Sequence, residues 1–496
     1  MKKQFYYFSR VLCALLLCVG IVVTSCEETN PVDDNKTEQG GNEDKCPATL
    51  TLGSVTATTA TFTGHLDVPA SDLSFSQVTV YYSDAETFNM DSAQSVSATS
   101  FDNQQNFTIT LTNLKYNTKY NYCMVAEVKS EKTYGDVLEF TTLKHPYELS
   151  YDLDVASATD LSSSGSANCY IISESGLYKF KPVKGNSNES VGNIASAFLL
   201  WESFGTSIVP EPLDLISAFG YKGGYIVFQT ADAFKEGNAV IAAKDADGNI
   251  LWSWHIWFTD QPQGQEYYNN AGTMMDRNLG AISATPGDVG ALGLLYQWGR
   301  KDPFLSASTI SSNIQAESTI TWPSAVSSDS SNGTIAYAIA NPTTFIAYND
   351  SNNDWYYTGS SSTDNTRWTA SDKAKSIYDP CPSGWRVPDG GSTGVWVKAI
   401  GSSSYFRYAY DSIDEGMNFS GKFGSDQPIW YPASGSRHGF DGSLVSVGRD
   451  GYFWSASPSY AYYLSFSYDG FVDPLYSNNR AHGLSVRCLQ ELKCGI

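Results

Sequence analysis

Histidine is scarce in this sequence, and basic residues are outnumbered by acids. Five His occur among 496 residues, and no two lie within ten positions of each other. A zinc hydrolase needs several imidazoles or thiolates at short spacing, as in HExxH. Lys and Arg number 31 against 52 Asp and Glu, which gives a formal net charge of −21. The composition argues against a His-based zinc site and against nucleic-acid binding, which requires clustered basic side chains.

Loop motifs for phosphate and calcium are also missing. The chain has no GxxxxGK[ST] loop, no DxDxDG loop, and no EPN or QPD triplet beside a WND triplet. Asp-Gly pairs occur in GRDGY (448–452) and SYDGFVDP (467–474), but Asp-Gly is ordinary turn chemistry. We expect no cofactor, no metal and no catalytic residues, and calcium has no supporting motif. Carboxylate pairs for glycoside hydrolysis stay open, because only geometry can select them among 52 acids.

Aromatic residues are plentiful. They make up 14% of the chain, whereas charged residues reach only 17%. This balance favours β-sandwich or mixed β architecture over helical bundles. A chain of 496 residues is too long for one core, so we expect three domains, mainly β: two β-sandwiches and a loop-rich α+β domain.

The amino terminus resembles a bacterial lipoprotein signal over residues 1–25. Two lysines and an arginine precede an apolar run at 11–23, which is too short to span a bilayer comfortably. The run leads into Val23-Thr24-Ser25-Cys26, which resembles a lipobox. This predicts lipidation at Cys26 and an outer-membrane anchor; an ordinary cleaved signal is the alternative.

Residues 26–45 form a polar, acidic segment without aromatic residues. Such a segment buries too little apolar surface to fold, so we expect a solvated tether. Acids directly after the lipidated Cys also resemble the surface-export signal of Bacteroidetes lipoproteins. We therefore expect the protein to face the cell exterior.

The next segment, residues 46–143, shows short runs of alternating apolar and polar residues. Examples are FSQVTVYYS (75–83) and FTITLTNL (107–114). Alternation at period two predicts strands with one buried face. Leu114, then Tyr116-Asn117-Thr118 and Tyr120, resembles the tyrosine corner of fibronectin type III domains. We expect a sandwich of that kind here, serving as a spacer.

Residues 144–259 predict a second β-sandwich. Asp247-Gly248 stands between two apolar runs and predicts a hairpin. On the second strand, Trp252, Trp254, Ile256 and Phe258 share one face. An aromatic row of this kind is more often core than a glycan platform. His255, on the opposite face, has no metal-spaced partner, so we interpret it as a hydrogen-bonded strand histidine.

The last segment, residues 260–496, carries five motifs in order: MMDRNLGA (274–281), GLLYQWGRKDPF (293–304), CPSGWRVP (381–388), YFWSAS (452–457) and GLSVRC (483–488). Together they resemble the Fibrobacter succinogenes major paralogous domain, which is common in secreted and surface proteins of Bacteroidetes. The resemblance implies a C-type-lectin-like fold with long loops. It implies no particular ligand or reaction.

Two cysteines of these motifs, Cys381 and Cys488, form a natural disulfide pair in an oxidising compartment. A pairing of Cys46 with Cys123 is a weaker hypothesis, and Cys169 and Cys494 have no assigned partner. Formylglycine-generating enzymes share the lectin-like fold, but their chemistry needs a reactive cysteine pair. A structural disulfide here therefore argues against that activity.

Exposed aromatics in polar loops are candidates for a ligand surface, because they can stack on a sugar. Two loops supply them, at 349–368 and in PIWYPASGSRHG (428–439). Local loop packing is the alternative. The candidate ligand-binding residues are Trp355, Tyr356, Tyr357, Trp430, Tyr431, Arg437 and His438. We expect the tryptophans inside the family motifs to be core.

The sequence thus predicts a non-enzymatic surface lipoprotein, an adhesin or glycan- or protein-binding module whose partner is a glycan or a host or surface protein. One alternative is a structural subunit of a fimbria or surface assembly, which would present a long unpaired edge strand. Another is a hydrolase or polysaccharide-utilisation accessory, which would present a pocket with two acids about 5 to 10 Å apart.

Overall fold

A computed structural model describes eleven stretches of the chain. They are residues 46–56, 58–115, 118–143, 153–348, 353–360, 366–369, 374–401, 406–424, 429–457, 461–477 and 479–491. The expected signal peptide, Cys26, the acidic tether and Cys494 lie outside these residues. So do Tyr116 and Asn117 of the expected tyrosine corner.

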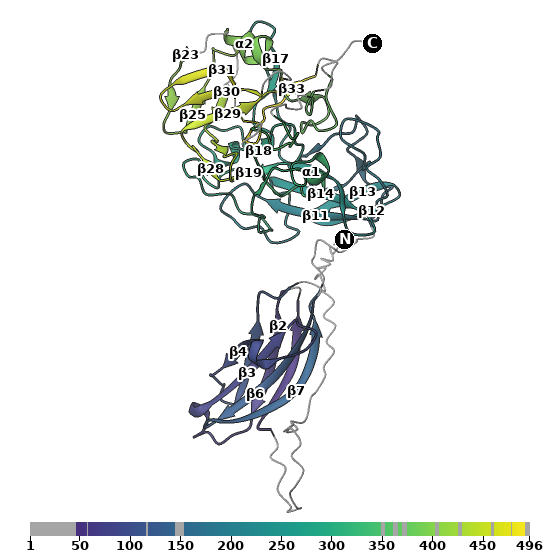
Figure 1. The fold of residues 1–496 in the computed structure, drawn as a ribbon, viewed down its shortest axis with the longest axis vertical. Helices are drawn as coiled ribbons and strands as arrows, with labels where there is room; N and C mark the ends of the chain where they lie inside the picture. Colours follow the sequence, from purple (N-terminus) through teal and green to yellow (C-terminus); the bar gives the residue numbers. More distant parts are fainter. Residues whose placement is uncertain are drawn as a thin grey trace, which may run out of the picture. The chain divides into compact units, whose positions relative to one another are not determined.

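The described residues divide into two compact units. The first unit is residues 46–143, and the second unit is residues 153–491 (Figure 1). Within the described ranges, none of the helices has the length and apolar character needed to cross a membrane. The fold is mainly β, as predicted.

The first unit is an antiparallel β-sandwich. A three-stranded sheet, β1-β2-β5, faces a four-stranded sheet, β4-β3-β6-β7. The strands are β1 (Ala48–Val55), β2 (Ala60–Leu66), β3 (Ser76–Ser83), β4 (Gln94–Ala98), β5 (Asn106–Leu111), β6 (Lys119–Val128) and β7 (Glu131–Thr141). Single 3-10 turns at Leu73–Phe75 and Met90–Ser92 connect strands on the surface.

Alternation explains the core of the first unit. On β6, Tyr120, Tyr122 and Met124 point into the core with Phe62 of β2, whereas Cys123 does not belong to that cluster. The Tyr120 hydroxyl accepts a hydrogen bond from the backbone N–H of Lys115 at 2.9 Å. This is the bond that defines a tyrosine corner.

The weaker cysteine hypothesis finds no support. Within the described part, Cys46, Cys123 and Cys169 are free thiols. The Cys123 Sγ donates to the carbonyl of Gly135 at 3.1 Å, and burial raises the pKa of this thiol to about 11.

The second unit begins with two four-stranded sheets, β12-β13-β10-β8 and β11-β14-β15-β9. The strands are β8 (Thr159–Asp160), β9 (Cys169–Ile172), β10 (Leu177–Phe180), β11 (Ser196–Ser203), β12 (Ile216–Lys222), β13 (Tyr225–Thr230), β14 (Gly237–Lys244) and β15 (Ile250–Phe258). The expected hairpin joins β14 and β15, with Gly248 at φ +84°.

The two faces of β15 meet different partners. Trp252, Trp254, Ile256 and Phe258 are buried between the two sheets, as predicted. Trp257 on the opposite face joins a second core. That core combines β9, β11 and β14 with residues from 275 to 488. The expected boundary at 259/260 therefore does not separate two independent cores.

The rest of the second unit is built around a nine-stranded sheet. Its main order is β19-β18-β32-β29-β30-β31-β23, with β27 attached at β32 and β28 paired with β27. The strands are β18 (Leu294–Gln297), β19 (Phe304–Leu305), β23 (Phe406–Arg407), β27 (Ser436–Arg437), β28 (Leu444–Val445), β29 (Asp450–Trp454), β30 (Tyr462–Ser467), β31 (Phe471–Ser477) and β32 (Gly483–Ser485).

Smaller sheets flank it. They comprise β16 (Gly264–Tyr267), β17 (Gly272–Met275), β33 (Leu489–Gln490) and β22 (Trp385–Arg386); β20 (Val326–Ser327) and β21 (Ile346–Ala347); and β24 (Tyr410–Asp411), β25 (Gly416–Asn418) and β26 (Trp430–Pro432). Trp298 and Trp454, from the motifs at 293–304 and 452–457, are fully buried, as predicted, and Trp385 packs at the edge of the same core.

Helices are short. The described ones are α1 (Ile335–Ala340) and α2 (Val395–Ile400), with 3-10 turns at Val289–Ala291 and Gly391–Thr393. The described residues just before the disulfide turn are not helical: the chain makes an isolated bridge at Lys375 and a turn at 377–378.

Candidate functional site

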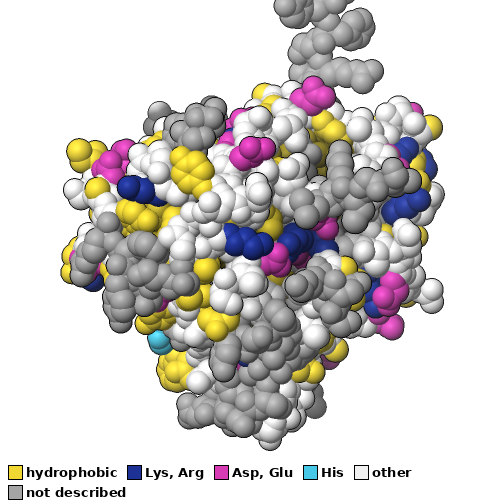
Figure 2. All heavy atoms as spheres, turned by 90° about the horizontal axis from the view of Figure 1, so that it is seen from above, with side chains coloured by type: hydrophobic (Ala, Val, Ile, Leu, Met, Phe, Trp, Pro, Cys, Tyr) yellow, Lys and Arg dark blue, Asp and Glu magenta, His cyan; other side chains and the backbone are white. Residues whose placement is uncertain are grey.

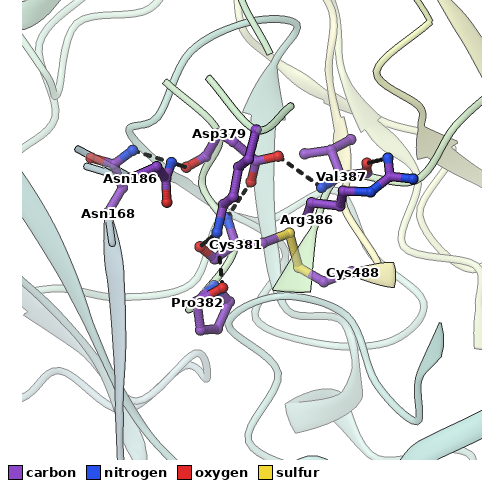
Figure 3. Close-up of a disulfide and its surroundings, with 9 residues drawn as sticks. Asn168, Asn186, Asp379, Cys381, Pro382, Arg386, Val387 and Cys488 are labelled. Atoms are coloured by element: carbon purple, nitrogen blue, oxygen red, sulfur yellow. Dashed lines mark hydrogen bonds between the residues drawn. A yellow bond between two sulfur atoms is a disulfide. The ribbon is translucent and has the colours of Figure 1, made fainter. Parts of the chain in front are cut away.

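A disulfide joins Cys381 and Cys488, which are 107 residues apart, so the predicted bond is present. The carboxylate of Asp379 organises the turn beside it (Figure 3). Its two oxygens accept from the backbone N–H groups of Cys381 and Val387, both at 2.9 Å. Burial raises the pKa of Asp379 to about 6. The buried Lys375 Nζ donates to the carbonyl of Cys381 at 2.7 Å.

This turn is also held to the sandwich. The Asn168 Nδ2 donates to the carbonyl of Asp379 at 2.9 Å (Figure 3). Its Oδ1 accepts a hydrogen bond from the Trp252 indole N–H at 3.0 Å. Asn186 donates to the carbonyl of Ser376 at 2.7 Å. Buried hydrogen bonds therefore join the disulfide region to the sandwich.

A groove of about 430 Å³ lies on one face of that sheet. Its walls come from strands β27 to β32 and the segments that join them. The lining residues are Ser436, His438, Val445, Asp450, Tyr452, Tyr463, Ser465, Ser467, Phe471, Tyr476, His482 and Leu484. The volume falls within the range of about 300–1,000 Å³ that is usual for small-molecule sites.

Strand alternation places these side chains. On β30, Tyr463, Ser465 and Ser467 line the groove, whereas Leu464 and Phe466 enter the core on the other face. The same alternation on β29 directs Tyr452 to the groove. Serines leave open space where larger side chains would fill it, so the small residues of β30 leave a hollow beside the packed tyrosines.

Three tyrosines form the aromatic wall. The rings of Tyr452 and Tyr463 meet edge to face at 5.9 Å, and those of Tyr463 and Tyr476 lie 5.3 Å apart. Tyr463 is buried, while Tyr476 keeps 44% of its surface exposed. Tyr476 therefore offers an accessible ring on a support of packed rings.

The acidic group in the groove is Asp450. The Tyr452 hydroxyl donates to its Oδ2 at 3.1 Å. Burial, followed by the nearby Asp450 charge, raises the pKa of Tyr452 above its usual value, so this phenol stays protonated. In the described ranges, no group of three or more His, Cys, Asp or Glu side chains is arranged to hold a metal.

Two histidines, His438 and His482, also line the groove. The rings of His438 and His482 lie edge to face at 5.3 Å. The His482 Nδ1 accepts from the backbone N–H of Gly439 at 3.2 Å. Burial, and next the His438 charge, lower the pKa of His482 to about 4. At neutral pH His482 is therefore uncharged, with its proton on Nε2.

The polar-loop candidates lie elsewhere. Trp355 is only 1% exposed, because its indole N–H donates to the carbonyl of Trp298 at 2.8 Å and the guanidinium of Arg367 lies 4.8 Å from its ring. Tyr356 and Tyr357 are half-buried beside it. The expectation of exposure is wrong for Trp355, which packs the loop onto the core.

The expectation of exposure is also wrong for Trp430 and Tyr431 in the second loop. Trp430 is 5% and Tyr431 0% exposed. The Tyr431 hydroxyl lies 2.6 Å from that of Tyr267, and Arg487 stacks 3.7 Å from its ring. Both residues therefore serve the core. In this conformation neither can stack on a ligand.

Arg437 is also buried, unlike its neighbour His438. Its guanidinium donates to the carbonyls of Leu305 and Gly442, at 2.8 Å and 2.7 Å, and burial lowers its pKa to about 10. Arg437 thus ties strands together. Among the predicted ligand-binding residues that the structure describes, His438 is the one that lines the groove.

Sequence reasoning missed the tyrosines and Asp450. YYLSFS (462–467) alternates bulky apolar residues with small polar ones, a signal that one face of β30 is polar and hollow. GRDGY (448–452) and SYDGFVDP (467–474) were interpreted as turns, and the second is one, with Gly470 at φ +84°. The first also delivers Asp450 and Tyr452 to the groove.

No family model and no curated protein matches the chain. Solved structures that align with part of it include the FN1–FN3 domains of chicken CNTN1, at 20% identity and a TM-score of 0.16 over 19% of this chain and 31% of that chain. The sensor domain of the anti-sigma factor RsgI4 from Pseudobacteroides cellulosolvens aligns at 20% identity and a TM-score of 0.16, over 20% and 97%. Neither likeness carries a functional argument.

Proposed function

We propose that the chain is a non-enzymatic surface lipoprotein that binds a glycan or protein ligand in the groove of its nine-stranded sheet. The groove itself carries this proposal: it combines an accessible Tyr476 ring, the Asp450 carboxylate and serine hydroxyls in a concave space of about 430 Å³. Concave sites with aromatic walls and a few convergent polar groups are typical of ligand binding.

The remaining parts of the proposal come from the sequence. Cys26 would carry the lipid, the acidic segment 26–45 would be the tether, and the first unit would be a spacer. The five motifs of residues 260–496 resemble the major paralogous domain of Bacteroidetes surface proteins, with its lectin-like fold. On the face drawn in Figure 2, Lys and Arg lie beside Asp and Glu rather than forming a broad basic patch, which agrees with a partner other than nucleic acid.

A binding array tests the groove. The purified full-length protein is applied to glycans and to matrix and surface proteins, with calcium and with a chelator. We expect a ligand whose binding falls at least tenfold in Tyr476→Ala, because stacking area is lost. Tyr468→Ala is the matched control: Tyr468 is 56% exposed on the same hairpin but does not line the groove. Equal loss in both variants would contradict the proposal.

Metabolic labelling tests the anchor. Palmitate label should enter the wild-type protein and be absent from Cys26→Ser. Protease added to intact cells should digest the wild-type protein if it faces outward. A label that persists in Cys26→Ser would refute lipidation at this residue.

An assembly subunit is the second candidate. Strand β7 is eleven residues long and stands at the edge of its sheet, with Tyr134 and Val137 about half exposed. Edge strands of this length can accept a strand from another chain. Residue-specific cross-linking at Tyr134 in intact cells, yielding ladders of this chain, would favour this function.

The hydrolase alternative has less support. Of the groove's described lining residues, one is a carboxylate, whereas glycoside hydrolysis uses two. Ser392 stands in a GxSxG pattern (390–394), but it is exposed and lies in a 3-10 turn before α2. It is not on the sharp strand-to-helix turn of a nucleophile elbow.

A further inference from the structure

The charge of the groove restricts what it can hold. Its described lining contains Asp450 and no Lys or Arg. Two arginines that adjoin lining residues in sequence make contacts of their own: the Arg437 guanidinium donates to backbone carbonyls, and that of Arg449 lies over the Tyr468 ring at 4.7 Å. A sulfate, phosphate or carboxylate on the ligand would meet the Asp450 charge without a cation to pair with. Anionic ligands are therefore disfavoured.

The aromatic geometry disfavours a cation held among the tyrosines. A cation site needs open ring faces around a space. Here Tyr463 contacts both Tyr452 and Tyr476, with centroids at 5.9 Å and 5.3 Å. The rings fill the space between themselves, and Tyr476 presents its exposed surface outward. That arrangement suits one flat apolar face laid against a ring, as the C–H face of a pyranose offers.

The polar groups suit hydroxyl donors. Asp450 is a carboxylate with two oxygens, and the Tyr452 hydroxyl bonds to its Oδ2. Among the described residues, none donates a hydrogen bond to the Oδ1 of Asp450. Carboxylates accept several hydrogen bonds, so Asp450 can receive hydroxyl groups of a ligand. Ser436 and Ser465, also in the lining, can donate and accept. A ring that carries several hydroxyls matches this set.

From these three features we propose that the groove binds a neutral pyranose of a glycan, stacked on Tyr476 and hydrogen-bonded through its hydroxyls to Asp450. The inference rests on the proposed function, because it names the ligand class of the same groove. His482, which also lines the groove, is uncharged at neutral pH and adds no charge that would favour an anion.

Titration calorimetry with three sugar classes tests the ligand class. The full-length protein is titrated with neutral oligosaccharides of glucose, galactose, mannose and N-acetylglucosamine, with sialylated and sulfated counterparts, and with glucosamine oligomers as cations. We expect binding of a neutral sugar, weakened at least tenfold by the charged forms. Tighter binding of an anionic or a cationic form would overturn the inference.

Variants locate the contact. Tyr476→Ala and Asp450→Asn should each weaken neutral-sugar binding about tenfold or more, which is the scale of one charge-assisted hydrogen bond or one stacked ring. Tyr476→Phe should retain binding, and Tyr468→Ala should change it less than twofold. Unchanged binding in both Tyr476→Ala and Asp450→Asn, with circular dichroism showing folded protein, would refute the site.

Two further outcomes separate this inference from the proposed function. A protein ligand that needs Tyr476, with no sugar bound, would overturn the sugar assignment and leave the proposed function standing. No ligand of any kind on the arrays, from folded protein, would remove both.

Discussion

The two units hold their cores together in different ways. The first unit buries alternating aromatic and aliphatic side chains between two sheets, and its ion pairs, such as Lys115–Asp84, lie on the surface. The second unit buries charges and a disulfide: Arg367 pairs with Asp354 where both side chains are at most 1% exposed. We infer that the second unit, with its short strands and long connections, depends on a disulfide and buried ion pairs in addition to packing, more than the regular sandwich of the first unit does.

Breaking the disulfide should have the largest effect. Replacing Cys381 and Cys488 with alanine releases a loop of 107 residues, and the chain-entropy model gives a loss of about 4.7 kcal/mol for a loop of that length. Hydrogen exchange read peptide by peptide should show faster exchange throughout 153–491 and no change in 46–143. Equal acceleration in both units would contradict the difference between them.

Removing one buried cation should lower the free energy of unfolding of the second unit nearly as much as removing the disulfide. Arg367→Met leaves the Asp354 carboxylate buried without its guanidinium, and breaking such pairs costs about 3–5 kcal/mol. Arg367 also stacks on Trp298 and Trp355, at 5.0 Å and 4.8 Å. Urea unfolding of the second unit measures the loss. A change below about 1 kcal/mol would show that the pair is solvated.

His255 should make the stability of the second unit depend on pH. Burial lowers the pKa of this imidazole to about 3, against 6.5 unfolded. The contribution of His255 to the free energy of unfolding is therefore fully present above pH 6.5. It is lost as the pH falls toward 3, by at most about 1.4 kcal/mol per pH unit. Urea unfolding at pH 5 and pH 7 should show a smaller pH difference in His255→Gln. His65→Gln, at an exposed position of the first unit, is the control.

The smallest effect is expected at the surface of the first unit. Lys115→Met removes the pair with Asp84, in which the lysine side chain is 72% exposed. Exposed pairs contribute little to the free energy of unfolding, because water screens them. The backbone N–H that binds Tyr120 is unchanged by the substitution. A loss as large as that of Arg367→Met would erase the contrast between buried and exposed pairs.

The difference between the two units also explains which structural features could be predicted from the sequence. Period-two alternation predicted the first sandwich and the buried row from Trp252 to Phe258, because strands with one buried face show this pattern. The pairing of Cys381 with Cys488 was predictable from their motifs. Trp355 was misplaced because its polar neighbours suggested exposure, whereas its indole N–H finds a carbonyl 57 residues away. Such a partner is set by tertiary packing.

The groove could not be predicted from local sequence patterns, for a related reason. Its lining comes from β27 to β32, and one of these strands pairs with strands that are distant in sequence, since β32 lies between β18 and β29. Alternation on one strand indicates which residues share a face. It does not show which other strands supply the rest of the wall.

The most direct test of the account is a hydrogen-exchange footprint of the full-length protein with a saturating ligand from the array. We expect slower exchange in 450–454 and 462–477, which contain the strands β29 to β31 of the groove. Protection confined to 353–360, the loop of Trp355, with 450–477 unchanged, would contradict it.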